Sequence, residues 1–85
     1  SPMIFLNIGE PDFTAPAGVL EAAQRCLSSG RTQYTQATGL PALREALSRW
    51  YRERFDLDVP ARRIVITAGA SAALQLVCLA LVNPG

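Results

Sequence analysis

The sequence contains neither histidine nor lysine among its 85 residues. Without histidine the chain cannot build a Ser-His-Asp or Cys-His catalytic site, and a conventional zinc site needs more than its 2 cysteines. Without lysine it has no ε-amino group for a Schiff base or for general base catalysis. We therefore expect no catalytic residue and no metal ligand within this chain, and the reactive residue of any such chemistry must lie elsewhere.

Charge of either sign is also scarce. The 8 basic residues, all of them arginine, stand against 7 acidic residues, which gives a formal net charge of +1. The longest basic run is Arg62-Arg63, so the sequence has no basic patch of the kind that binds nucleic acid. Because 49% of the residues are hydrophobic, the composition indicates a folded protein rather than a disordered one.

Features of membrane proteins and exported proteins are missing as well. No charged leader with an apolar core opens the chain. The apolar stretch 68–82 is interrupted by polar residues and is shorter than the roughly 20 residues that a bilayer requires. Cys26 and Cys78 lie in apolar helical patterns, and we expect buried free thiols in a reducing compartment. These features predict a cytoplasmic protein without a membrane partner.

Hydrophobic periodicity, together with proline and glycine at the ends of segments, predicts three helices and two short strands. The strands are Met3–Ile8 and Ile64–Ile66. The helices run from about Pro16 to a stop at Gly30, from Leu40-Pro41 to about Phe55, and from about Ala70 to Val82.

The second predicted helix has an apolar face and a charged face. The apolar face consists of Leu43, Leu47, Trp50 and either Tyr51 or Phe55. We expect Trp50 to lie in the core rather than against a cofactor. On the charged face, Glu45–Arg49 and Arg49–Glu53 have the i,i+4 spacing of ion pairs, each contributing about 0.2–0.5 kcal/mol.

The third predicted helix is apolar on nearly every side. Its large apolar residues are Leu74, Leu76, Val77, Leu79, Leu81 and Val82. A helix of this kind is normally surrounded by protein. Two amphipathic helices and two short strands cannot surround it, so we expect the chain to be a piece of a larger fold that self-associates when isolated.

The sequence Gly69-Ala70-Ser71 connects the second predicted strand to this apolar helix. Free backbone N–H groups and the helix dipole favour an anion at such a helix N-terminus. Small side chains allow a phosphate to approach the backbone closely. On local sequence alone, a tight connection with no ligand remains the simpler alternative.

Several separated motifs occur in an order that resembles the N-terminal part of class I/II aminotransferases, which are fold-type I enzymes that use pyridoxal 5′-phosphate (PLP). The motifs are Asn7–Phe13, Gln33–Thr35, Gly39–Ala46, Ile66–Leu74 and Asn83–Gly85. The resemblance implies an α/β fold, a homodimer, and transfer of an amino group between an amino acid and a 2-oxo acid.

The resemblance also implies roles for individual residues. The turn Gly69-Ala70-Ser71 would hold the PLP phosphate, with Ala70 in place of a glycine common in the family. Tyr34 matches a tyrosine whose hydroxyl reaches the cofactor phosphate of the neighbouring subunit, although simple packing in a dimer interface is an alternative. Gly9 matches a glycine whose backbone lies against the substrate carboxylate.

The resemblance divides the fragment into three parts. Residues 1–15 would be a strand and loop on the side of the small domain, 16–63 two helices and a connection, and 64–85 the first strand, phosphate turn and helix of the large domain. Two alternatives stay open. Another fold-type I PLP enzyme, a lyase or a synthase, shares these motifs, and a stand-alone helical interaction module would explain the apolar third helix.

Overall fold

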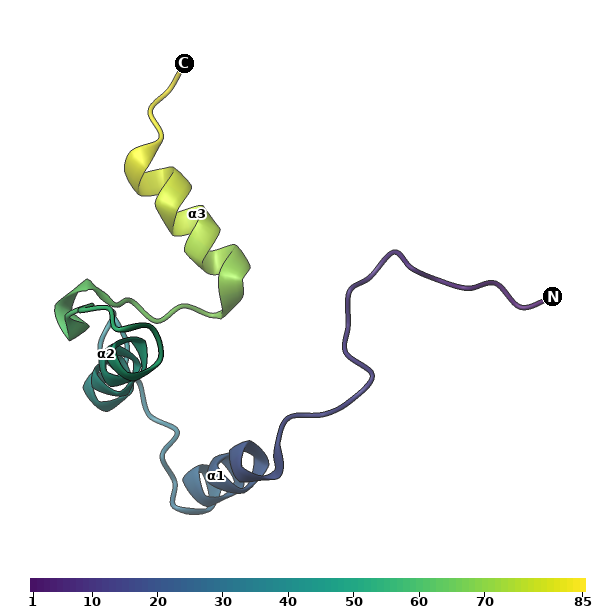
Figure 1. Ribbon diagram of the computed structural model, residues 1–85, viewed down its shortest axis with the longest axis horizontal. Coiled ribbons are helices and arrows are strands. Elements are labelled where there is room, and N and C mark those ends of the chain that lie inside the picture. Colours follow the sequence, from purple (N-terminus) through teal and green to yellow (C-terminus); the bar gives the residue numbers. More distant parts are fainter. The chain divides into compact units, whose positions relative to one another are not determined.

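The computed structural model describes all 85 residues and contains four helical elements (Figure 1). They are α1 (Ala17–Ser28), α2 (Pro41–Phe55), the short 3₁₀ helix η1 (Ala61–Arg63) and α3 (Gly69–Leu81). The chain forms two compact units, Ser1–Gln33 and Tyr34–Gly85. Each unit is described by itself below.

The three long helices lie where the sequence predicts them, because their boundaries depend on local signals. The Pro16 carbonyl accepts hydrogen bonds from the N–H groups of Val19 and Leu20 at the start of α1. Pro41 is the first residue of α2, where its missing N–H has no helical partner in any case. α2 ends at Asp56, which adopts a left-handed conformation with φ 53°.

The two predicted strands are not formed. Met3–Ile8 contains no regular structure, and its large apolar side chains are exposed. Ile64 is extended, with φ −106° and ψ 127°, yet the segment Ile64–Thr67 has no neighbouring strand. A strand requires a neighbouring strand that accepts and donates its backbone hydrogen bonds. The second segment makes only one backbone hydrogen bond to a distant part of the chain, from the Ile66 N–H to the Thr38 carbonyl (3.0 Å).

No large hydrophobic side chain is fully buried, so the prediction of a core on the apolar face of α2 is wrong for this chain. Trp50 is 45% exposed. Its ring packs edge-to-face against Tyr51 and Phe55, with ring centroids 5.1 and 5.2 Å away. These three aromatic residues form a small surface cluster in place of the expected core.

One polar stripe of α2 binds the segment that follows the helix. Arg44, Ser48 and Arg52 are spaced four residues apart and therefore share one side of the helix. Arg44 donates to the Ile64 and Ala61 carbonyls, and Ser48 donates to the Val59 carbonyl.

Arg52 pairs with Asp58 at 3.0 Å, which is the single ion pair in the chain. The predicted pairs Glu45–Arg49 and Arg49–Glu53 do not form. The charged side chains at these positions lie on the surface, where hydration competes with pairing.

Gly39 is the single buried residue, and it lies against Ile66. Its φ is +107°, and a Cβ atom at this position would lie 2.7 Å from Cβ of Ile66. Only glycine avoids both the steric overlap and the unfavourable φ. Gly39 therefore allows the start of α2 to approach the extended segment before α3.

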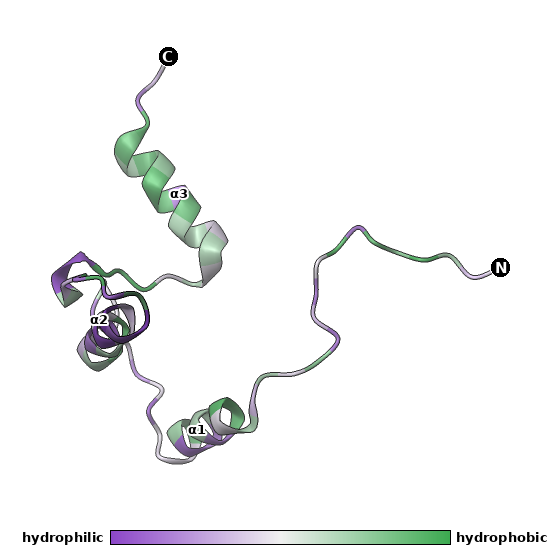
Figure 2. Ribbon diagram, in the orientation of Figure 1, coloured by the Kyte–Doolittle hydropathy of each residue, from purple (hydrophilic) through white to green (hydrophobic).

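Within its unit α3 makes no contact with α2 or η1, and most of its apolar side chains are exposed. Figure 2 shows hydrophobic residues along this helix. Leu79 and Leu81 are each 75% exposed. Cys26 and Cys78 are free, as predicted, but both are exposed, so the prediction of buried thiols is wrong. None of the helices is long and apolar enough to cross a membrane.

Candidate functional site

The extended segment Ile64–Thr67 leads directly into a tight turn at the start of α3. The Gly69 N–H donates to the Thr67 carbonyl at 2.9 Å, and the Thr67 hydroxyl donates to the Gly69 carbonyl at 2.8 Å. Gly69 has φ +82°, a conformation that side-chain-bearing residues adopt at a cost. Hydrogen bonds between Thr67 and Gly69 therefore close the turn, and its backbone conformation favours glycine as the first residue of α3.

The N–H groups of Ala70 and Ser71 have no hydrogen-bond acceptor in the chain. In α2 the N–H of the second residue, Ala42, also has no acceptor, but those of the third and fourth residues, Leu43 and Arg44, both donate to the carbonyl of the preceding Leu40. No such bond reaches the Ala68 carbonyl at the start of α3, and no side chain caps this helix. Two backbone donors consequently point away from the start of α3 without a partner.

The surroundings of these two donors suit an anion. The first turn of α3 contains no acidic residue, so no carboxylate competes for the N–H groups or repels a negative charge. Nothing lies within 4 Å of a Cβ atom built on Gly69. The Ser71 hydroxyl makes no hydrogen bond within the chain and is available as a third donor. These features fit a phosphate group, which accepts several hydrogen bonds at once.

The structure brings together the three residues of the turn, all of which belong to the Tyr34–Gly85 unit. Tyr34 is fully exposed, at 104% of its reference area, and its hydroxyl makes no hydrogen bond. Gly9 belongs to the Ser1–Gln33 unit, and no atom lies within 4 Å of a Cβ built on it. The roles predicted for Tyr34 and Gly9 stay predictions.

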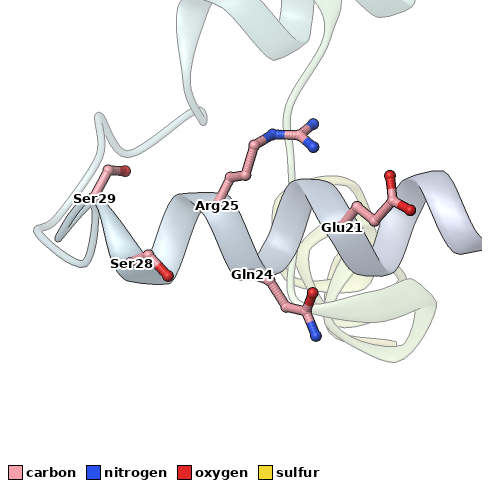
Figure 3. A pocket seen from close by; sticks show the side chains of 5 residues that line it. All are labelled: Glu21, Gln24, Arg25, Ser28 and Ser29. Carbon is pink, nitrogen blue, oxygen red and sulfur yellow. The ribbon is translucent and has the colours of Figure 1, made fainter.

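Other surface features offer no comparable chemistry. A hollow along α1 is lined by the side chains of Glu21, Gln24, Arg25, Ser28 and Ser29 (Figure 3). All five residues are exposed, and Glu21 and Arg25 form no ion pair. No group of three or more histidine, cysteine, aspartate or glutamate side chains is placed to hold a metal ion. The turn at α3 is thus the best-defined candidate site in the chain.

Sequence reasoning missed Arg44, which the structure places between α2 and the segment leading to the turn. Its Nε and Nη2 atoms each lie 2.8 Å from a main-chain oxygen, of Ile64 and Ala61 respectively. A signal existed, because the polar positions 44, 48 and 52 repeat every four residues on one side of α2. The acceptors are backbone carbonyls, however, and since every residue has one, the sequence does not show which carbonyls Arg44 binds.

Comparison with known families places the whole chain in one family. The family described as "Aminotransferase class I and II" matches residues 1–85. The chain therefore belongs to the class I and II aminotransferase family.

Individual relatives agree with this assignment. A protein of Methanocaldococcus jannaschii named "Probable aspartate aminotransferase" is 44% identical over 85 residues, which is 100% of this chain and 23% of that protein. The "Aspartate aminotransferase" of Pyrococcus horikoshii is 41% identical over 83 residues, 98% of this chain and 21% of that protein. The "Arginine--pyruvate transaminase" of Pseudomonas aeruginosa is 39% identical over 83 residues, again 98% of this chain and 21% of that protein.

The chain thus spans less than a quarter of the length of these relatives. No solved structure gives a significant match to it.

Proposed function

We propose that this chain is the N-terminal part of a PLP-dependent enzyme that transfers an amino group between an amino acid and a 2-oxo acid. The observation that carries the proposal is the family match over residues 1–85. The relatives support amino transfer over a lyase, a synthase or an interaction module, because their names describe transaminases. The complete protein would have the α/β fold of fold-type I enzymes and would act as a homodimer in the cytoplasm.

In this proposal the turn Gly69-Ala70-Ser71 anchors the cofactor phosphate. The N–H groups of Ala70 and Ser71 donate to phosphate oxygens, and the Ser71 hydroxyl adds a third donor. Gly69 allows the close approach, because it has no side chain. Bound PLP supplies an electron sink for the reaction, and the protein supplies position and electrostatics.

Two further residues would act in the same site. We assign to Tyr34 the role of a hydroxyl donor toward the cofactor phosphate of the neighbouring subunit, and to Gly9 a backbone position beside the substrate carboxylate. The full exposure of Tyr34 in the single chain is consistent with a partner subunit covering it. The lysine, which the chain lacks, would come from residues outside these 85.

The domain assignment follows the same proposal. Residues 1–15 belong to the side of the small domain, 16–63 to the two helices and their connection, and 64–85 to the large domain. In the large domain, neighbouring strands would supply the backbone partners that Ile64–Thr67 lacks here.

Substitutions at Ser71 in the complete protein test the phosphate anchor. Ser71→Pro removes a backbone donor that has no partner within the chain, so it breaks no helical hydrogen bond. The matched control Ser71→Ala removes only the hydroxyl, a neutral donor contributing about 0.5–1.5 kcal/mol. We expect Ser71→Pro to raise the PLP dissociation constant much more than Ser71→Ala.

Absorbance titration of the cofactor-free protein gives both dissociation constants, and circular dichroism establishes that both variants fold. Equal PLP affinities in the two folded variants would show that the backbone of this turn does not hold the phosphate. Consumption of aspartate in the presence of pyruvate or another 2-oxo acid tests the amino transfer itself. Absence of transfer across a panel of amino acids, in a protein that binds PLP, would instead favour a lyase or a synthase.

A further inference from the structure

Arg44 connects α2 to the backbone that leads into the phosphate turn. Its guanidinium group is partly buried and donates from two nitrogen atoms, to the carbonyls of Ala61 and Ile64. The two acceptors lie at the two ends of a short bend that contains η1. One planar guanidinium group therefore fixes where this bend leaves α2 and where the extended segment begins.

A second connection fixes the same segment closer to the turn. The Ile66 N–H donates to the Thr38 carbonyl at 3.0 Å, and the Ile66 side chain lies against Gly39. Gly39 directly precedes Leu40, whose carbonyl caps α2. The extended segment is thus held to α2 both at Ile64 and at Ile66.

Beyond Ile66 the chain has little freedom before it reaches the unpartnered donors. Thr67 and Gly69 are joined by two hydrogen bonds, of 2.9 and 2.8 Å. Ala70 and Ser71 follow at once. A shift of Ile64 relative to α2 would therefore be transmitted to the Ala70 and Ser71 N–H groups.

We propose that Arg44 is a positioning residue for phosphate binding, which orients the Ala70 and Ser71 amides through its two hydrogen bonds to the Ala61 and Ile64 carbonyls. The inference rests on the proposed function, because it concerns the same phosphate site. Arg44 touches neither the phosphate nor the substrate in this account. Its effect is specific to the phosphate of the cofactor and does not extend to the pyridine ring.

This specificity provides the test. In the complete cofactor-free protein, the dissociation constants of PLP and of pyridoxal, which lacks the phosphate, are measured for four proteins. They are the unmodified protein, Arg44→Met, Arg44→Lys and the control Arg49→Met. Arg49 lies on the same helix, is exposed and makes no hydrogen bond.

We expect Arg44→Met to weaken PLP binding by about tenfold or more, because the segment that orients the Ala70 and Ser71 amides loses both of its hydrogen bonds to Arg44, while pyridoxal binding changes by less than about twofold. Arg44→Lys keeps the charge but lacks the planar fork, so it should recover only part of the difference. Arg49→Met should leave both constants unchanged.

The opposite results overturn the inference. Equal weakening of PLP and pyridoxal binding in Arg44→Met would mean that the substitution disturbs the fold in general. Full recovery by Arg44→Lys would mean that charge matters and the two-carbonyl geometry does not. If Arg44→Met does not fold, Arg44→Lys alone carries the test, because an unchanged PLP-to-pyridoxal preference in that folded variant would also refute the proposal.

Ser71→Pro, measured in the same way, separates this inference from the proposed function. If Ser71→Pro removes the preference for PLP over pyridoxal and Arg44→Met does not, the phosphate site stands and the role of Arg44 is refuted. If neither variant changes the preference, the turn does not bind phosphate, and the inference about Arg44 is refuted with it.

Discussion

Within Tyr34–Gly85, α2 and α3 differ in how many of their N–H groups and side chains have partners in the chain. The Leu43 and Arg44 N–H groups in the first turn of α2 donate to the Leu40 carbonyl, and the polar stripe of this helix binds the following segment through Arg44 and Ser48. The Ala70 and Ser71 N–H groups of α3 have no acceptor, and α3 contacts neither α2 nor η1. Groups of the chain itself therefore interact with the first turn and the polar stripe of α2. The Ala70 and Ser71 donors and the apolar surface of α3 are left free to bind a ligand or another protein surface.

The largest expected effect concerns the apolar surface of α3. If this surface lacks partners, the isolated chain should self-associate, because Leu74, Leu79 and Leu81 are each at least 66% exposed. With Leu76, Val77 and Val82, these side chains represent about 9–18 kcal/mol of burial at roughly 1.5–3 kcal/mol each. Sedimentation equilibrium at micromolar concentration measures the association.

A monomer with sharp, cooperative unfolding would contradict this difference between α2 and α3. It would mean that α3 finds partners within the chain that the structure does not contain. A double variant, Leu79→Gln with Leu81→Gln, should weaken the association. Both leucine side chains are 75% exposed, and glutamine at these positions makes the surface of α3 less apolar.

The next effect concerns the close approach at the start of α2. Gly39→Ala in the complete protein should lower the free energy of unfolding by about 2 kcal/mol or more, through steric overlap with Ile66 and an unfavourable φ. Gly69→Ala has the unfavourable φ without the overlap and should cost about 1–2 kcal/mol.

Gly18→Ala is the control within a helix, with no atom near the added Cβ, and it should stabilise α1 by up to about 1 kcal/mol. Thermal unfolding of the cofactor-free protein gives the order of the three variants. A Gly39→Ala variant as stable as Gly18→Ala would show that the start of α2 does not pack on Ile66.

The smallest effects distinguish the two ends of the polar stripe. Ser48→Ala leaves the half-buried Val59 carbonyl without its donor and should cost about 0.5–1.5 kcal/mol. Asp58→Ala removes an ion pair whose side chains are 68% and 78% exposed, and it should cost about 0–1 kcal/mol, less at high salt. Urea unfolding at two salt concentrations compares them, and a larger, salt-independent loss for Asp58→Ala would reverse the expected order.

The sequence predicts best what depends on neighbouring residues. The three helices were predictable because Pro16, Pro41 and the apolar periodicity act locally. The prediction of two strands was wrong for this chain. A strand forms by pairing with another extended segment, and neither Met3–Ile8 nor Ile64–Ile66 pairs with one here. The prediction that Trp50 and the cysteines are buried was wrong for the same reason, because a side chain is buried only where another part of the protein packs over it.

At the candidate site, local sequence left a tight connection with no ligand as the simpler alternative, and the family resemblance favoured a phosphate at Gly69-Ala70-Ser71. The structure adds the Ala70 and Ser71 N–H groups, which have no acceptor in the chain. The contributions of Arg44 and Gly39 could not be predicted from local pattern. Arg44 depends on backbone carbonyls, and Gly39 on the Ile66 side chain, more than fifteen positions away along the chain. The Gly39–Ala46 motif appeared in the sequence only as a resemblance, and the approach of Gly39 to Ile66 gives it a physical reason.

Covalent labelling tests most directly whether this chain belongs to a PLP enzyme whose Schiff-base lysine lies outside these 85 residues. The complete protein and the isolated 85-residue chain are each incubated with PLP, reduced with borohydride and mapped by peptide mass spectrometry. We predict a stoichiometric pyridoxyl label on one lysine of the complete protein, outside these residues, and no label at an internal residue of the isolated chain. An unlabelled complete protein, or a stoichiometric internal label in the isolated chain, would contradict the account.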